Sequence, residues 1–182
     1  MRLFVGIDFP ETTVAALAEF QSELRRQTCT GRFKRQENFH LTLKFLGETA
    51  EESLDRLTDA LSRVAATHAP FRLGLGDIGQ FGNGPTVRVV WVGLKGDLDR
   101  LKALQAGVET AAARVGFAPE DRPYRPHITV AQDVVFSDAG WRARLKPTWP
   151  DEFAVTEFSL ILSTQEYGRR VYIPLHIFKL QV

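Results

Sequence analysis

Two short segments of this 182-residue sequence carry the same pattern of histidine, aliphatic residue, threonine and aliphatic residue. They are His40-Leu41-Thr42-Leu43 and His127-Ile128-Thr129-Val130, about half the chain apart. Side chains on a β-strand alternate between its two faces. In each copy, therefore, the histidine and the threonine share one face and the aliphatic residues share the other. The aliphatic face suits a core, which leaves two matching His/Thr pairs for chemistry.

Two histidines of this kind suit acid–base catalysis on a phosphodiester. One group must take a proton from the attacking water and another must give a proton to the leaving oxygen. An imidazole with an ordinary pKa near 6.5 can do either at neutral pH. Thr42 and Thr129 can donate hydrogen bonds to the non-bridging oxygens as charge builds there. A lone histidine on a strand is usually structural, but the repeated pattern favours a catalytic pair of His40 and His127.

The elements that must position the two motifs alternate between strands and helices. Strands are expected at residues 2–9, 39–46, 71–81, 86–94, 153–164 and 170–180 and around the second motif, and helices at 11–27, 51–67 and 97–115. The Gly82-Asn83-Gly84-Pro85 segment predicts a hairpin turn. Residues 28–36 and 134–151 are expected to be mostly loop. This order predicts an α+β fold whose two lobes face each other across a cleft within one compact domain, residues 1–182.

Composition and charge restrict the function further. The net charge is +1, so no strong basic field indicates a long nucleic-acid groove. Cys29 is the single cysteine, so no internal disulfide can form, and it has no neighbouring histidine to activate it as a nucleophile. The first residues lack the apolar run of a signal peptide or a membrane span. We expect a cytoplasmic protein with no membrane partner.

The residues around both motifs resemble the two-histidine phosphoesterases. The segments Asn38–Glu48 and Arg125–Ala131 are similar to the two signature segments of that superfamily. The most similar group is the bacterial and archaeal RNA 2′,3′-cyclic phosphodiesterases, formerly called 2′-5′ RNA ligases. The opening Arg2–Asp8 and the late segments Phe158–Leu160 and Tyr172–Leu175 are also similar, so the resemblance spans nearly the whole chain.

The resemblance implies a bilobal duplicated fold with pseudo-twofold symmetry. Two mainly antiparallel sheets would flank a central cleft, with helices on the outside. It also implies metal-free opening of a terminal 2′,3′-cyclic phosphate to a 2′-phosphate, with weak reverse 2′-5′ ligation. His40 would protonate the departing 3′ oxygen and His127 would activate water, roles that the residues alone do not assign. The partner would be an RNA or a nucleotide with a 2′,3′-cyclic phosphate end, and the protein a monomer.

One position departs from the family pattern, and four others are candidates for binding the substrate. Family members often carry arginine five residues after the second histidine, where this chain has Gln132. Arg125 and Lys44 are candidate cations for the phosphate, and Lys44 is expected on the same face as the first histidine. Phe9 and Tyr124 are candidates for stacking on a base, with core packing as the alternative for both.

Other functions remain open at this point. A related enzyme could act on ADP-ribose 1″,2″-cyclic phosphate or on 2′-5′ oligoadenylate, and a non-catalytic module could bind RNA ends without turnover. No carboxylate, cysteine or third histidine stands at ligand spacing from the motifs, so no metal and no cofactor is expected. His68 and His176 are expected to be structural or exposed. Gly74–Gly79 matches G-x-G-x-x-G, but a turn follows it where a dinucleotide site needs a helix.

Overall fold

The structure is a computed structural model that describes residues 1–181. Its strands are β1 (Arg2–Ile7), β2 (Thr28–Phe33), β3 (Leu41–Glu48), β4 (Phe71–Phe81), β5 (Val87–Gly96), β6 (Ile128–Phe136), β7 (Phe153–Val155), β8 (Glu157–Glu166) and β9 (Arg169–Lys179). Its α-helices are α1 (Glu11–Arg26), α2 (Leu54–Ala66), α3 (Leu98–Arg114) and the short α4 (Trp141–Arg144). No helix among residues 1–181 is both long and apolar enough to cross a membrane.

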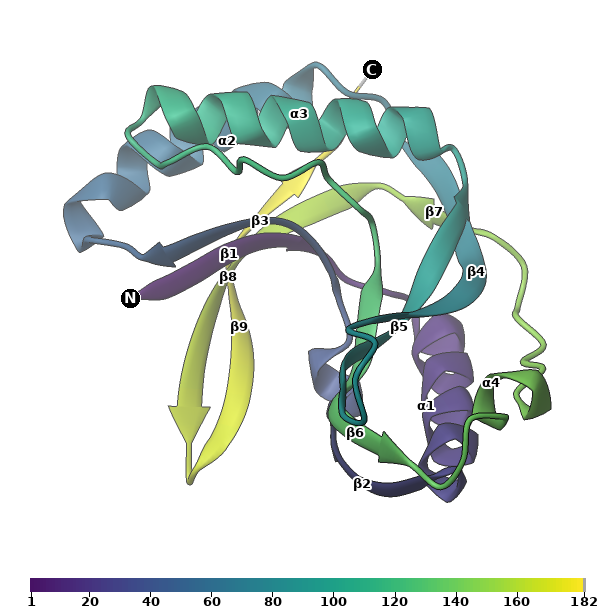
Figure 1. Cartoon of the computed structure of the whole chain (residues 1–182). Coiled ribbons are helices and arrows are strands. Elements are labelled where there is room, and N and C mark those ends of the chain that lie inside the picture. Colours follow the sequence, from purple (N-terminus) through teal and green to yellow (C-terminus); the bar gives the residue numbers. More distant parts are fainter. Residues whose placement is uncertain (182) are drawn as a thin grey trace.

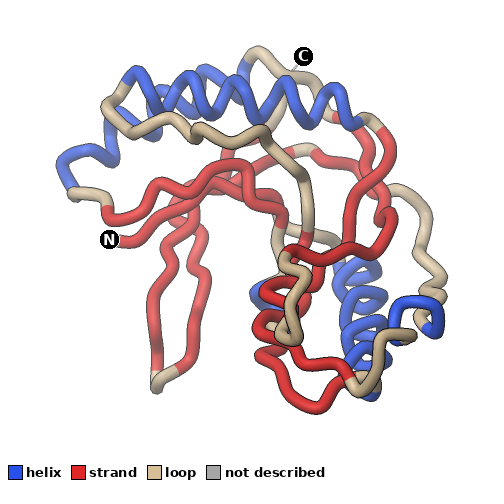
Figure 2. Tube along the Cα trace, viewed as in Figure 1, coloured by secondary structure: helices blue, strands red, loops and turns tan. Residues whose placement is uncertain are grey.

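The strands form two antiparallel sheets, one in each lobe. The first sheet has the order β3-β1-β8-β9 and the second has the order β2-β6-β5-β4-β7. Helices α2 and α3 cover the outer side of the first sheet, and α1 lies against the second (Figures 1 and 2). The hairpin of β8 and β9 projects from the first sheet, away from α2 and α3 (Figure 1). The predicted α+β fold with two antiparallel sheets is confirmed.

Each lobe is built from both halves of the sequence. Helix α1 follows β1 of the first sheet, but its apolar stripe of Leu17, Phe20 and Leu24 is buried in the core of the second sheet. Helix α3 follows β5 of the second sheet, but Leu101, Leu104 and Val108 are buried in the core of the first. This spacing of three and four residues places each stripe on one side of its helix. Each half of the sequence therefore contributes strands and helices to both lobes.

Three expectations about strands are corrected. Residues 28–36 contain the edge strand β2, whose mostly exposed side chains leave no alternating apolar pattern. The strand predicted at 153–164 is broken at Thr156, because β7 pairs with β4 in the second sheet whereas β8 pairs with β1 in the first. The strand predicted at 39–46 begins at Leu41 and runs to Glu48, so His40 stands just before it.

Candidate active site

Each motif histidine directly precedes its strand and is fixed by a carbonyl two residues earlier. His40 Nδ1 lies 2.8 Å from the carbonyl oxygen of Asn38, and His127 Nδ1 lies 2.7 Å from that of Arg125. A carbonyl oxygen only accepts, so Nδ1 is the donor in both rings and Nε2 is left as the reactive nitrogen. His40 Nε2 lies 2.9 Å from Thr42 Oγ1 and accepts its hydroxyl proton. Both imidazoles are thus held in the same tautomer.

Aromatic side chains hold both imidazoles from the sides. Each histidine packs against two rings, and all four contacts are tilted or edge-on. The distances between ring centroids are 4.6 Å to Phe4 and 5.0 Å to Tyr172 for His40, and 5.0 Å to Phe81 and 6.5 Å to Trp91 for His127. The aromatic contacts repeat on both sides of the cleft, as the two motifs do.

His40 is the more buried of the two histidines, with 8% of its surface exposed. Burial lowers the pKa of His40 to about 4, and the positive charge of Lys34 and the nearby His127 act in the same direction. The hydrogen bond to the Asn38 carbonyl opposes this shift. His40 is therefore neutral in the free protein at neutral pH.

A β-bulge follows the threonine of the first motif. Thr42 lies opposite Gly6 and Lys44 opposite Val5, so Leu43 is an extra residue in β3. Directly opposed residues point to the same face, and Val5 is buried in the core beneath α2 and α3. The expectation that Lys44 shares the face of His40 is therefore wrong, because the bulge reverses the alternation.

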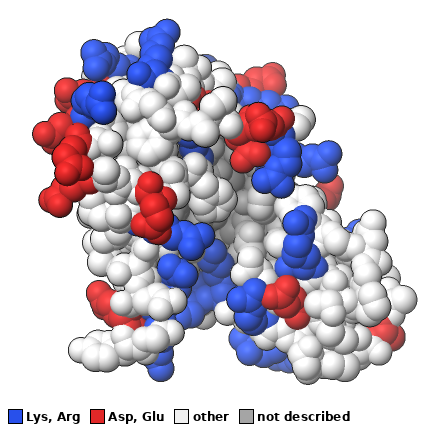
Figure 3. Space-filling view, turned by 60° about the vertical axis from the view of Figure 1, so that its left-hand side comes forward, with Lys and Arg blue, Asp and Glu red and all other residues white. Residues whose placement is uncertain are grey.

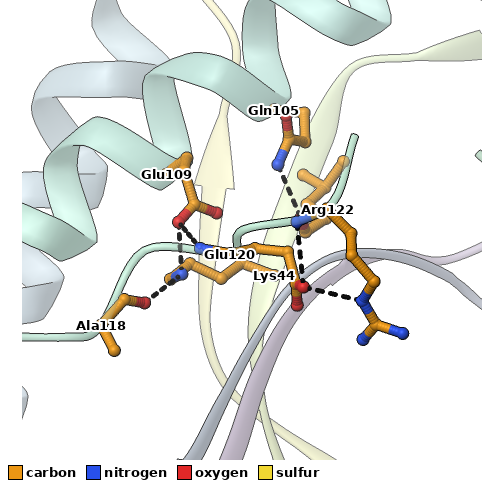
Figure 4. Close-up of polar contacts among 7 residues, drawn as sticks. Lys44, Gln105, Glu109, Ala118, Glu120 and Arg122 are labelled. Carbon is orange, nitrogen blue, oxygen red and sulfur yellow. Dashed lines mark hydrogen bonds and ion pairs between the residues drawn. The ribbon is translucent and has the colours of Figure 1, made fainter. Parts of the chain in front are cut away.

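Lys44 instead belongs to a buried polar cluster under α3. Its ammonium donates to Glu109 Oε1 at 2.6 Å and to the carbonyl of Ala118 at 2.9 Å, and its side chain is 3% exposed (Figure 4). The same carboxylate oxygen accepts the backbone N–H of Glu120. The charge of Lys44 is thus paired with Glu109, and the pair anchors the segment that leads to the second motif.

The second motif has an equivalent bulge. Thr129 lies opposite Trp91 and Ala131 opposite Val90, so Val130 is the extra residue in β6. Gln132 is therefore on the same face as Thr129, although it lies three positions later in the chain. Its neighbour across the strand pair with β2 is Arg32, which forms an ion pair with Asp133. The bulge thus brings Gln132 to the His/Thr face, while the guanidinium of its neighbour Arg32 is held by Asp133.

A glutamine supports each bulge from the helix that packs on that sheet. Gln21 of α1 is buried and donates to the carbonyl of Val130 at 2.8 Å and to that of Lys34 at 2.6 Å. Gln105 of α3 donates to the carbonyl of Leu43 at 3.4 Å. A bulge breaks the regular ladder of hydrogen bonds, and these amides give its carbonyls a partner.

A cavity of about 600 Å³ lies between the lobes and borders Thr42 and His127. Arg125 and Tyr124 line it, and the Tyr124 hydroxyl donates to the carbonyl of Thr42 at 3.0 Å. Burial raises the pKa of Tyr124. Phe9 is not in its lining, because its side chain packs against both cores, with its ring edge-on to Phe153.

The sequence patterns do not single out several residues that the structure brings to the site. Arg88, Phe81 and the 70% exposed Phe45 line the same cavity. Lys34 donates to the Tyr172 hydroxyl at 3.2 Å, close enough to His40 to affect its pKa. The sequence does show three cationic residues within 28–36. Because this stretch was expected to be a loop, the sequence could not predict which way their side chains point.

The remaining candidates lie outside the cleft or serve packing. The G-x-G-x-x-G residues are part of β4, and an ideal Cβ on Gly79 would lie 2.0 Å from Cζ2 of Trp91. His68 Nδ1 hydrogen-bonds to the carbonyl of Val64 at the end of α2, and His176 packs on Phe178 in β9. Within residues 1–181 no three histidine, cysteine or acidic side chains form a metal-ligand cluster.

Comparison with known families agrees with this geometry. The family model described as the 2′-5′ RNA ligase superfamily matches residues 10–166. The chain belongs to this superfamily. Crystal structures of Escherichia coli LigT, in apo form and complexed with 3′-AMP, resemble this superfamily member over 100% of its chain and 98% of theirs. Both have a TM-score of 0.80, with 32% and 31% sequence identity respectively.

Two curated relatives of this superfamily member carry the name RNA 2′,3′-cyclic phosphodiesterase. The Escherichia coli (strain K12) protein is 34% identical over 183 residues, which cover 96% of this chain and 93% of that protein. The Geobacillus stearothermophilus protein is 31% identical over 129 residues, which cover 71% of this chain and 41% of that protein. The match to the first relative covers nearly the whole of both chains.

Proposed function

We propose that this protein is an RNA 2′,3′-cyclic phosphodiesterase that hydrolyses a terminal 2′,3′-cyclic phosphate to a 2′-phosphate. The observation that carries the proposal is the duplicated motif: His40 and His127 are held in the same tautomer, His127 is close enough to His40 to act on its pKa, and Thr42 and His127 line the cavity between the two sheets. The relatives that carry this name support it. The LigT complex with 3′-AMP supports a nucleotide as the ligand.

The proposed reaction uses the two imidazoles on opposite sides of the phosphorus. His127 Nε2 takes a proton from water while the water oxygen bonds to phosphorus. The bond from phosphorus to O3′ breaks, and His40 Nε2 gives its proton to O3′. Thr42 and Thr129 donate hydrogen bonds to the non-bridging oxygens, where they would stabilise the pentacoordinate transition state.

The donor role requires His40 to gain a proton when substrate binds. The free imidazole is neutral, because burial keeps its pKa near 4. A phosphate anion close to Nε2 favours the charged form and raises that pKa. The negative charge of the bound substrate thus favours the protonated form of His40, which then acts as the acid. The reversed assignment, with His40 as the base, needs no such proton uptake.

Accessory residues take supporting roles in this proposal. Arg125 offers a cation at the cavity wall, and Tyr124 positions Thr42 by binding its carbonyl. Gln132 offers an amide dipole on the His/Thr face. We propose a monomer, since one chain supplies both His/Thr motifs. We also propose a cytoplasmic location, where the exposed thiol of Cys29 stays reduced.

The decisive experiment is product analysis on an oligoribonucleotide that ends in a 2′,3′-cyclic phosphate. We expect a 2′-phosphate as the product, and activity that survives EDTA. We expect His40→Ala and His127→Ala each to lower kcat by at least about 10²-fold, the usual contribution of general acid–base catalysis. His176→Ala is the matched control, because that histidine lies on the edge strand β9, and it should retain activity. Full activity in either cleft variant would refute the proposal.

A further inference from the structure

A second groove begins beside His40 and follows the hairpin of β8 and β9. We call it the hairpin groove; it has a volume of about 330 Å³. Its walls are the single-turn helix Gln36–Asn38 and the end of the hairpin, and its lining includes Arg35, Arg169, Arg170, Tyr167 and Tyr172. The ring of Tyr172 also packs edge-on against the His40 imidazole. The groove and the catalytic cleft therefore meet at this tyrosine.

The hairpin groove carries more positive than negative charge. Arg35 pairs with Glu37, and Glu166 is the other carboxylate in the lining. Arg169 and Arg170 are exposed and have no ion-pair partner among residues 1–181. Lysine and arginine side chains gather along the lower part of the hollow between the lobes (Figure 3). Arg170 Nη1 donates to the Ser163 hydroxyl at 3.2 Å. Neither guanidinium is held by a carboxylate of the residues that the structure describes, so both can bind an anionic ligand.

The walls of the groove are tied to the catalytic histidine. The side-chain amide of Asn38 donates to the carbonyl of Arg170 at 3.0 Å, and the Asn38 carbonyl accepts from His40 Nδ1. At the turn of the hairpin, the ring of Tyr167 is fully exposed. A cationic groove with an exposed aromatic ring is the usual arrangement for binding a single nucleic-acid strand.

We propose that the hairpin groove binds the RNA strand on the 5′ side of the cyclic-phosphate nucleotide, which makes an oligoribonucleotide a better substrate than a mononucleotide. This inference rests on the proposed function. A cyclic phosphate occupies the 3′ end of a strand, so the chain leaves the site in one direction only. The 600 Å³ cavity, with Phe45 and Phe81 in its lining, suits the terminal nucleoside. The arginines of the groove suit the phosphates that precede it.

The test compares RNA binding by Arg169→Gln/Arg170→Gln with binding by the wild type. The probe is a fluorescein-labelled decaribonucleotide with a terminal 2′-phosphate, followed by fluorescence anisotropy, so the result does not depend on turnover. We expect about 10-fold weaker binding, and a salt dependence of log K that falls by about 0.7 for each lost phosphate contact. Hydrolysis of 2′,3′-cyclic AMP should stay within about twofold of the wild type, because no groove phosphate is involved.

A matched control and a second variant make the test specific. Arg56→Gln/Arg63→Gln removes the same charge from the exposed side of α2 and should leave RNA affinity unchanged. Tyr167→Asn removes the exposed ring while tolerating the positive φ of 49° at that position, and should weaken binding about fivefold. Unchanged affinity in both groove variants, or an equal loss in the α2 control, overturns the inference. A wild type that binds RNA but cleaves neither substrate would instead reject the proposed function.

Discussion

The burial of His40 makes protein stability depend on pH in a defined way. Folding lowers the pKa of His40 from 6.5 to about 4. Above the unfolded value the ring is neutral in both states and contributes nothing. Between the two values the unfolded chain binds a proton that the native state does not, so the free energy of unfolding falls as the pH falls. At about 1.36 kcal/mol per pH unit the full loss is about 3 kcal/mol.

The assay is urea unfolding of the wild type and of His40→Asn at several pH values near and between 7 and 4. Asparagine removes the titrating group, so the variant should lack this part of the pH dependence. The difference in unfolding free energy between the two proteins should therefore change by about 3 kcal/mol across that range. His176→Asn, on the exposed edge strand, should follow the wild type. A difference that stays constant within about 1 kcal/mol would show that His40 is not held neutral by burial.

The same group should respond to ligand in the opposite direction. Binding of 2′-AMP places a phosphate near Nε2 and favours the charged imidazole. Titration of the His40 ring protons by NMR should show a pKa raised well above 4 in the complex. If the pKa is unchanged by the nucleotide, His40 cannot be the proton donor at neutral pH, and the reversed assignment of acid and base follows.

Two further substitutions probe the residues that hold the site in place. Gln21→Leu leaves the carbonyls of Val130 and Lys34 without their side-chain donor, so we expect a loss of about 2 kcal/mol in urea unfolding. It should also lower kcat more than it raises KM, which a purely structural role would not do. Gly79→Ala would place a methyl group inside the Trp91 ring, so we expect altered tryptophan fluorescence and a loss of about 1–3 kcal/mol. Wild-type stability and spectra in both variants would contradict these expectations.

The fold class, and the placing of each motif histidine beside its threonine, could be predicted from local patterns. Alternation on a strand places His40 with Thr42 and His127 with Thr129, and the hydrogen bond between the first pair is present. Apolar stripes at helical spacing identified α1, α2 and α3. These features depend on a repeat of two residues in a strand or 3.6 residues in a helix. Such a repeat can be recognised within a short stretch of sequence.

The structural features that could not be predicted depend on pairing between strands that are distant in the sequence. A bulge adds one residue to a strand and leaves no mark in composition, so the side to which Lys44 points follows only from its partner Val5. The break at Thr156 is equally hidden, because residues on either side suit a strand and only the choice of sheet separates them. The edge strand β2 is mostly exposed and so shows no apolar pattern in the sequence. It is a strand because its backbone pairs with β6.

The exchange of elements between the lobes has a consequence for folding and for fragments. A cut in the turn at Gly82–Pro85 would separate β1, β3 and β4 from β5, β6, β8 and β9. Each sheet would then contain strands from both pieces, since β4 pairs with β5 and β1 pairs with β8. Neither piece could complete a sheet alone, and reassembly would require the two pieces to associate like the subunits of a domain-swapped dimer. We therefore expect the two lobes to unfold as one cooperative unit, and the opposing histidines to meet only when both halves of the chain have folded together.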